Sequence, residues 1–570
     1  MLNNAQLIHR LSVEERINLI LNKTVLATST VGDYDFPTIT LNENPILKDL
    51  KNTATVFPSN QTLALTWNEE LVTLVNKKRG FESSSIVENS LYKQDGNIFG
   101  RKSVSEDPFL TGKILGAQTK GLHDAGAFAS LDLENDELDT RKKYEVRLLP
   151  LQLALKANEY DMVIVDTVED LRYWRDEYQH HGLFFARAKN ELDIIRFFNA
   201  GATLISYEGD YDHAVEYIKE ALRRYKNEKA KLDNKMIFEN QYLEMLTDGK
   251  ILSLENLNLA CDRLISLMVS LNNKFEELNN RVYKKVFEKR NNKAIEVQGH
   301  QEAAYKGAVE SVVLLKNEGI LPLTINEKCA FFGDAFENYD YYQTSFGNVP
   351  TEFKSPLATA SEYFEIDCEA FAHGYLRGQE TKPELISAAV ELANKVKVAV
   401  VYLYNEGEEY LPKEQLELLK AIAETGVKVV AVVHTPCLVD LSFVDMCSAV
   451  LYVGETGQEG PRAVLDVLTG VANPSGKLTH TYPLLVADEH DTNGLPMYYN
   501  TTEQILYPFG FGLSYTTFDY HNLEITETGI SLSVTNTGEY AGLDVVQVYV
   551  QKKDSNTVFK NRVLRGFKKV

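Results

Sequence analysis

Short apolar runs alternate with longer amphipathic stretches from about residue 20 to residue 290. The amphipathic stretches, such as 190–198 and 212–225, carry apolar residues at the spacing of a helix. A strand followed repeatedly by a helix is typical of a parallel sheet, and the length of the region fits a (β/α) barrel, complete or incomplete. The runs predict strands at 24–28, 55–57, 127–131, 162–166, 183–186 and 203–207.

A second α/β unit begins near residue 300. The residues before it, 226–292, are charged and helical in pattern, so we interpret them as closing helices of the barrel and a connector. Val- and Ala-rich runs then predict strands at 329–332, 398–402, 429–433 and 449–453. Continuous apolar strands are buried on both faces, which indicates a parallel sheet between helices. We therefore expect a three-layer α/β/α sandwich.

The pattern changes again after Tyr507. The segments 529–538 and 544–551 alternate apolar and polar residues around Asn and Gly turns, as antiparallel strands do. About 55 residues follow Ser514, whereas a complete β-sandwich of this kind has roughly 100. We expect a partial β-sandwich with an unpaired edge. The chain is thus an α/β multidomain protein, with domains predicted at 1–292, 300–500 and 510–570.

Composition and charge narrow the class of partner. The formal charge of −22 and the isoelectric point near 5.1 argue against nucleic acid and against an anionic membrane surface, because both would repel the chain. We find no signal peptide and no apolar stretch of the roughly 20 residues that a membrane helix needs. The five cysteines are scattered and odd in number, which favours reduced thiols and a cytoplasmic location.

One strand ends in an unexpected residue. The apolar run 182–186 is followed by Arg187, at the place where a (β/α) barrel positions its chemistry. The neighbouring pair His180 and His181 suggests a metal site, but no third ligand stands at useful spacing, so we expect both side chains at the surface and no metal. The stretch 470–478 lacks the first glycine and the Ser/Thr of a phosphate-binding loop.

Several motifs resemble glycoside hydrolase family 3, the β-glucosidase family. "ESVVLLKNEGILPL" (310–323), "GQEGPRAVLDVLTGVANPSGKL" (457–478) and "YPFGFGLSYTTFDY" (507–520) resemble its signatures in the second half. "FPSNQTLALTWNEEL" (57–71), "SEDP" (105–108) and "RDEYQHHGLFF" (175–185) resemble its barrel motifs, and the segment after 533 resembles the fibronectin type III-like domain that follows them. The resemblance implies a retaining hydrolase of small β-glycosides or oligosaccharides in carbohydrate metabolism, without a cofactor.

In that chemistry two carboxylates about 5–5.5 Å apart flank the glycosidic bond. One is the nucleophile and the other donates a proton and later activates water. The family's nucleophile is an aspartate in a pattern like G-F-V-V-S-D-W after R-D-E-W, and the corresponding position here is Arg187. A guanidinium stays protonated in a protein and cannot attack an anomeric carbon.

The resemblance also assigns the remaining site residues. The acid/base position falls on Glu406, with Glu408 and Glu409 as alternatives in the same loop. The family's substrate-gripping Lys-His pair falls near Ser130 and Leu131, so it is absent. Residues assigned to substrate binding are Glu43, Arg101 and Arg141.

Three interpretations of Arg187 remain open at this point: it grips an anionic ligand such as a sugar acid or sugar phosphate, it marks a dead site, or the alignment is slipped. A rewired hydrolase would need another carboxylate, and Asp166 and Glu208 follow neighbouring strands. The two competing hypotheses are a hydrolase with residual or rerouted activity, and a non-catalytic pseudo-enzyme that binds a sugar or a protein partner.

Overall fold

The structure is a computed structural model of the 570-residue chain. It describes residues 4–22, 41–42, 55–82, 86–90, 104–132, 149–157, 160–288, 295–324, 328–338, 354–363, 370–405, 410–436, 438–484, 498, 505–527, 529–551 and 562–570. Within these residues no helix is both long enough and apolar enough to cross a membrane.

Seven parallel strands form the first sheet, in the order β1-β7-β6-β5-β4-β3-β2. This is the cyclic order of a (β/α) barrel, because each strand lies beside the next in the chain and β1 returns beside β7. Among the described residues no pairing joins β1 to β2. The strands are β1 (Leu21–Asn22), β2 (Leu41–Asn42), β3 (Ile86–Ser90), β4 (Phe128–Asp132), β5 (Met162–Val165), β6 (Leu183–Ala188) and β7 (Leu204–Tyr207).

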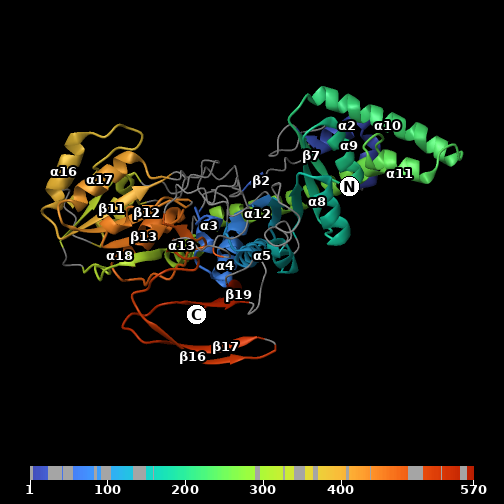
Figure 1. Ribbon diagram of the computed structural model, residues 1–570. Helices are drawn as coiled ribbons and strands as arrows, with labels where there is room; N and C mark the ends of the chain where they lie inside the picture. Colours follow the sequence, from blue (N-terminus) through green and yellow to red (C-terminus); the bar gives the residue numbers. More distant parts are fainter. Residues whose placement is uncertain are drawn as a thin grey trace.

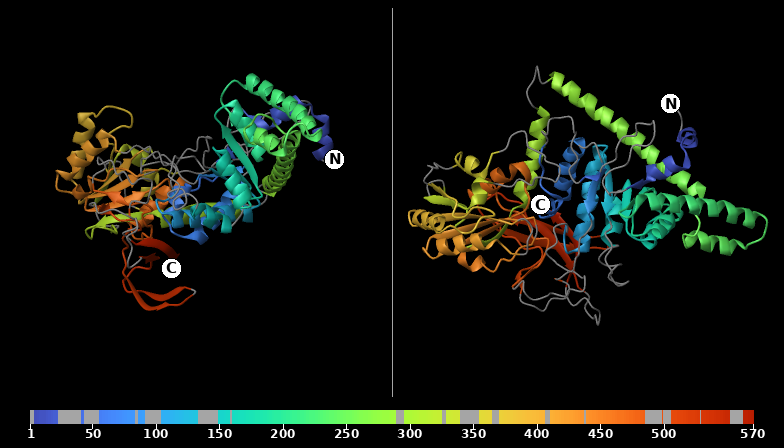
Figure 2. Two further views of the ribbon diagram at one scale, coloured as in Figure 1. Left: turned by 45° about the vertical axis from the view of Figure 1, so that its right-hand side comes forward. Right: turned by 90° about the horizontal axis from the view of Figure 1, so that it is seen from above.

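After three of the barrel strands, β5, β6 and β7, a helix begins at a capping residue that stands two or three residues beyond the strand. Thr167, Asn190 and Asp210 each accept a hydrogen bond from the backbone N–H three residues on, which starts α8, α9 and α10. The helices of this part are α1 (Asn4–Arg10), α2 (Val13–Ile20), α3 (Asn60–Ala64), α4 (Glu69–Glu82), α5 (Pro108–Asp124), α7 (Leu149–Ala157), α8 (Val168–Arg172), the π-helix η2 (Tyr173–Glu177), α9 (Glu191–Ala200), α10 (Tyr211–Asp233), α11 (Glu239–Thr247) and α12 (Leu254–Glu288). The long α12 runs back from this helical layer toward the second unit (Figure 2).

The second sheet has six strands in the order β10-β9-β11-β12-β13-β8, parallel except for β8. Alternate residues of β11 enter two different cores: Ala399 and Val401 pack with α16 and α17, and Val400 and Tyr402 pack with α18. Helices therefore cover both faces, as a three-layer sandwich requires (Figure 1). Its elements are α13 (Ile295–Ser311), β8 (Val313–Asn317), β9 (Cys329–Phe332), α14 (Asp334–Glu337), α15 (Pro356–Ala360), β10 (Phe371–Ala372), α16 (Pro383–Ala393), β11 (Val398–Tyr404), α17 (Lys413–Ala423), β12 (Lys428–His434), η4 (Val444–Met446), β13 (Ala449–Val453), η5 (Gly457–Glu459) and α18 (Gly460–Leu468).

The last part of the chain consists of antiparallel strand pairs. β18 and β19 pack on the core, where Phe567 contacts the ring of Trp67 at 5.3 Å between centroids. The β16–β17 hairpin projects away from the body (Figure 1), and its Leu523 and Ile525 are 63% and 74% exposed. The strands are β14 (Tyr482–Pro483), β15 (Ile505–Tyr507), β16 (Phe518–Ile525), β17 (Ile530–Asn536), β18 (Val545–Val550) and β19 (Val563–Lys569).

The architecture confirms the predicted fold class, a barrel followed by an α/β/α sandwich. The strand predicted at 55–57 is wrong: the backbone of Val56 instead exchanges two hydrogen bonds with Gln458 of the second unit. The run 24–28 lies outside the described residues. The domain boundaries and the fibronectin type III likeness of the last strands stay predictions.

Candidate active site

Three charged side chains meet at the carboxyl ends of neighbouring barrel strands. Asp132 ends β4, Asp166 directly follows β5, and Arg187 is the fifth residue of β6. The register pairs Asp132 with Ile164 and Val165 with Ala186. Because side chains alternate between the faces of a strand, this register places all three charged residues on one face of the sheet.

Two carboxylates hold the Arg187 guanidinium. Its Nη1 and Nη2 donate to Oδ2 and Oδ1 of Asp132, each at 2.7 Å. Its Nε donates to Oδ1 of Asp166 at 2.6 Å, and Nη2 also donates to Oδ2 of Asp166 at 3.1 Å. These two bidentate contacts engage all four carboxylate oxygens and leave one guanidinium N–H, on Nη1, outside them.

The cluster is largely shielded from solvent. The side chain of Asp132 is 5% exposed, that of Asp166 is 14% exposed and that of Arg187 is 26% exposed. Burial alone would lower the pKa of Arg187, but the hydrogen bonds and charges of Asp132 and Asp166 outweigh it and raise that pKa above its ordinary value. Arg187 is therefore a permanent cation held between two aspartates.

This geometry bears on one of the uses proposed for Arg187, the binding of an anionic ligand. An anionic ligand would have to displace an aspartate from the guanidinium. The Arg187 guanidinium is thus already bound by two carboxylates of the protein. This arrangement argues against a sugar acid or sugar phosphate as its ligand.

The other carboxylates considered as nucleophiles fit poorly. Both oxygens of Asp166 accept hydrogen bonds from Arg187, which stabilises the carboxylate and lowers its reactivity. Glu208 lies just beyond β7 and is exposed to solvent.

Most of the other predicted site residues cannot be placed. Glu406 lies outside the described residues, as do its alternatives Glu408 and Glu409. Glu43, Arg101 and Arg141 also lie outside them. Ser130 and Leu131, assigned to the Lys-His pair, are buried in β4.

Asp132, the second carboxylate that holds Arg187, was not predicted from the sequence. It occupies the end of β4 as Asp166 marks the end of β5. Its signal was present, because the predicted strand 127–131 is followed by this aspartate and parallel strands end at the same edge of the sheet.

The predicted surface position of His180 is wrong. The side chain is buried, at 5% exposure, and its ring packs edge-on against Phe184 at 5.4 Å between centroids. A hydrogen bond from the backbone N–H of His180 to the Trp174 carbonyl closes the turn before β6. His181 is exposed, as expected. Among the described residues no group of His, Cys, Asp and Glu side chains could hold a metal ion.

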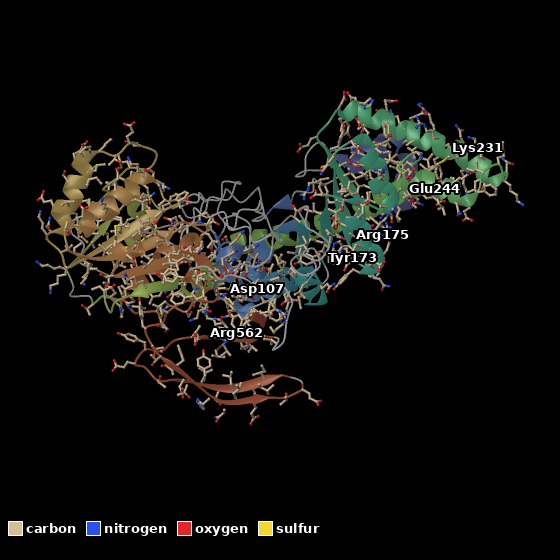
Figure 3. All side chains as sticks on the ribbon, in the orientation of Figure 1. Asp107, Tyr173, Arg175, Lys231, Glu244 and Arg562 are labelled. Carbon is tan, nitrogen blue, oxygen red and sulfur yellow. The ribbon has the colours of Figure 1, made fainter. Side chains whose placement is uncertain are left out.

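The motif 175–178 forms the end of a π-helix ahead of β6. Tyr173 and Arg175 lie on this turn at the side of the barrel part (Figure 3). Single π-turns occur often at functional sites. Here the turn stands ahead of β6, the strand that carries Arg187.

The "SEDP" motif joins the barrel to the second unit. Ser105 Oγ donates to the Thr479 carbonyl at 2.8 Å, and Glu106 accepts from the N–H of Thr481 at 2.7 Å. Asp107 caps α5 and accepts from Tyr498 Oη at 2.7 Å (Figure 3). This buried junction fixes the second unit relative to the barrel, so the motif has a structural role.

Comparisons with known proteins agree with this architecture. Residues 312–515 match the family described as "Glycosyl hydrolase family 3 C-terminal domain". Thermostable β-glucosidase B of Acetivibrio thermocellus is 26% identical over 99% of this chain and 80% of its own length. An exo-α-(1→6)-L-arabinopyranosidase of Bifidobacterium breve is 26% identical over 91% of this chain and 73% of its own.

Solved structures share the whole fold. The β-glucosidase of Bifidobacterium adolescentis has a TM-score of 0.78 at 23% identity, covering 99% of this chain and 87% of that one. The Kluyveromyces marxianus β-glucosidase, solved with glucose, has a TM-score of 0.79 at 17% identity, covering 100% and 92%. Together the family match over residues 312–515, the relatives along the full chain and the shared fold support the resemblance of this chain to glycoside hydrolase family 3.

Proposed function

We propose that this chain is a non-hydrolytic member of glycoside hydrolase family 3 that binds a small glycoside in its barrel. The observation that carries the proposal is the bidentate hold of Asp132 and Asp166 on Arg187. By resemblance Arg187 stands where the family's nucleophile stands.

A retaining glycosidase needs a carboxylate that attacks the anomeric carbon and later leaves it. Arg187 has no lone pair to offer, since it stays protonated. An acid/base residue, for which Glu406 is our candidate, could still donate a proton, but without a nucleophile the double displacement has no first step.

We assign the ligand class from the proteins that this chain resembles. Proteins that resemble this chain are named β-glucosidases, and structures with the same fold were solved with glucose bound. A β-glucoside or a similar small glycoside is therefore the ligand class we assign, with Glu43, Arg101 and Arg141 as candidate contacts. A hydrolase with residual activity is the competing function, because family membership favours it.

The location proposed is the cytoplasm. The three cysteines that the structure describes, Cys261, Cys329 and Cys447, are free thiols. Free thiols are typical of a reducing compartment.

The test compares the native protein with variants on nitrophenyl glycosides, alongside calorimetric titration with methyl β-glucoside. We expect sugar binding without turnover. Turnover by the native protein would refute the proposal, as would the absence of sugar binding.

A gain-of-function variant sharpens the test. Arg187→Asp alone would bring three carboxylates together, and their repulsion would raise their pKa values. We therefore combine Arg187→Asp with Asp132→Asn and Asp166→Asn, which leaves one carboxylate at the nucleophile position. Arg224→Asp on the exposed face of α10 is the matched control for charge reversal. Turnover that appears in the triple variant and not in the control supports an otherwise intact pocket.

A further inference from the structure

We propose that the tip of the arm formed by α10 and α11 is a self-association surface, through which two copies of this chain pair about a two-fold axis. The arm tip consists of the turn 234–238 between the two helices together with Glu239, Leu243 and Glu244 of α11. The proposal goes beyond the proposed function and is independent of it, because no residue of the arm tip belongs to the candidate active site.

The arm tip lies at one end of the molecule. α10 and α11 extend from the barrel part on the side away from the second unit, and the turn between them is the outermost point of that end in Figure 1 and in the view from above in Figure 2. Lys231 of α10 and Glu244 of α11 mark the same end in the side-chain view (Figure 3). This position leaves room for a second copy to approach the tip.

The turn between the helices has a defined backbone. Lys235 takes the left-handed conformation, with a φ of 57°, and its N–H donates to the Leu232 carbonyl at 2.9 Å. The N–H of Met236 donates to the Lys231 carbonyl at 2.8 Å. These two bonds are those of a Schellman motif, in which the residue at the position of Met236 frequently packs against the helix that it ends. Here the side chain of Met236 is 71% exposed, so the turn presents it to solvent.

Two further apolar side chains are exposed on the arm tip. Phe238 is 78% exposed, more than any other large apolar side chain among the described residues, and Leu243 is 51% exposed. The opposite side of α11 is packed, because Tyr242 is buried and its ring centroid lies 6.1 Å from that of Tyr225 on α10. Exposed apolar patches mark interaction sites, and Phe and Met are enriched at protein interfaces.

The charges beside these apolar residues are of both signs and have no partner. Lys235, Glu239 and Glu244 are exposed, and within the part of the chain that the structure describes none of the three forms an ion pair. Further back on α10 the lysines are paired within the helix, as Lys231 is with Glu228 at 2.7 Å. The arm tip therefore offers one free cation and two free anions around an apolar centre.

This pattern favours a second copy over a partner of one charge sign. An anionic membrane or an acidic protein would face Glu239 and Glu244, and a basic protein would face Lys235. In a two-fold contact the same patch is present on both sides, so Lys235 of each copy can pair with Glu239 or Glu244 of the other. The formal charge of −22 makes two copies repel each other in general, so association needs a patch of mixed sign such as this one.

The experiment is sedimentation velocity of the full chain at protein concentrations from about 1 μM to about 200 μM. The patch is small, so we expect a weak, reversible dimer whose fraction rises over this range. Phe238→Asp should raise the dissociation constant at least about tenfold, because it places a charge in the apolar centre of the contact. Val471→Asp, at a residue of the second unit that is 70% exposed, is the matched control and should leave the constant unchanged.

Two charge variants test the pairing itself. Lys235→Glu gives the arm tip charges of negative sign only, and Glu239→Lys combined with Glu244→Lys gives it charges of positive sign only, so each variant alone should stay monomeric. An equimolar mixture of the two variants should form a dimer again. All three side chains are exposed, so the substitutions leave the core intact, and association in the mixture shows that both variants are folded.

Each outcome decides for or against the proposal. A native protein that stays monomeric over this range overturns it, as does a dimer that Phe238→Asp does not weaken or a mixture of charge variants that stays monomeric. Binding of the native monomer to vesicles of phosphatidylcholine and phosphatidylserine, lost in Phe238→Asp, also overturns it and assigns the arm tip to a membrane surface. The assays of sugar binding and turnover test the proposed function separately, so failure of one proposal is distinguishable from failure of the other.

Discussion

Arg187 of β6 reaches past β5 to Asp132 of β4, and donates to both oxygens of that carboxylate at 2.7 Å. The Nε of Arg187 also donates to Oδ1 of Asp166, which directly follows the intervening strand β5. The contact joins three neighbouring strands at the edge where the barrel fold places its chemistry. Because the residue that by resemblance stands at the nucleophile position is a cation held by two carboxylates, we propose that the site binds without hydrolysis.

Removing the cation should destabilise the barrel. In Arg187→Met, Asp132 and Asp166 lose their counter-charge while they remain largely shielded from solvent. Breaking a buried ion pair by removing one partner costs about 3–5 kcal/mol. Urea unfolding of the variant should show a loss near the lower end of that range, because the cluster is partly exposed. Arg224→Met on the surface is the control, and an equal effect of both substitutions would contradict the role of the cluster.

The two aspartates should differ in their contributions. Asp132 is less exposed than Asp166, at 5% against 14%, and lies at the far end of the guanidinium. Asp132→Asn should therefore lower the free energy of unfolding by roughly 1.5–3 kcal/mol, and Asp166→Asn should lower it by less. A double-mutant cycle with Arg187 measures the coupling directly. A coupling near zero for both aspartates would show that the contacts do not stabilise the fold.

Asp107 should make stability depend on pH. Burial raises the pKa of Asp107 to about 6, against partly compensating hydrogen bonds from Leu110 and Tyr498. The folded state thus binds the proton more tightly than the unfolded state, so this contribution to stability is full below pH 4 and is lost as the pH rises through about 6. Asp107→Asn keeps a good helix cap and removes the titration.

The measurement is the free energy of unfolding of the native protein and Asp107→Asn between pH 4 and pH 8. The variant should gain stability relative to the native protein as the pH rises, by about 3 kcal/mol for a shift of this size. A difference that stays constant across the range would show that Asp107 does not titrate as described.

Lys569 should hold the C-terminal strand pair in place. Its side chain is 3% exposed, forms an ion pair with Glu310 at 3.3 Å, and donates to the carbonyls of Thr66 and Ser475 at 3.0 and 3.2 Å. Lys569→Met leaves these acceptors and the Glu310 charge without their donor, so we expect a loss of about 3 kcal/mol. Hydrogen exchange of Lys569→Met should show the backbone amides of β18 and β19 losing protection before those of the other strands. Lys568→Met, on an exposed neighbour, is the control.

The same lysine gives a signature at alkaline pH. Burial lowers the pKa of Lys569 to about 8, against the opposing charge of Glu310. Between about pH 8 and the ordinary lysine value the unfolded state binds more protons, so the native protein should gain stability relative to Lys569→Met as the pH rises through that window. If the free energies of unfolding of the native protein and of Lys569→Met declined in parallel over this pH window, the expectation would be contradicted.

Much of the fold could be predicted from the sequence because buried parallel strands carry a strong local signal. The runs at 329–332 and 449–453 match β9 and β13 residue for residue. The strand at 55–57 failed since an apolar run alone does not show what its backbone will bind, and Val56 binds Gln458 about 400 residues away in the chain.

The site was only partly predictable for the same reason. The position of Arg187 follows from a local pattern, but its pairing with Asp132 depends on strand order and register, which no local pattern specifies. His180 was misplaced because its burial depends on the way the chain turns after Trp174.

The most direct test of the central claim is release of nitrophenol from a nitrophenyl β-glucoside by the native protein at high concentration, with sugar binding measured on the same preparation. The account predicts that the protein binds methyl β-glucoside, and that its release of nitrophenol does not exceed the rate with buffer alone. Turnover above that rate, lost on substitution of Glu406, would show that the site hydrolyses glycosides despite Arg187 and would contradict the account.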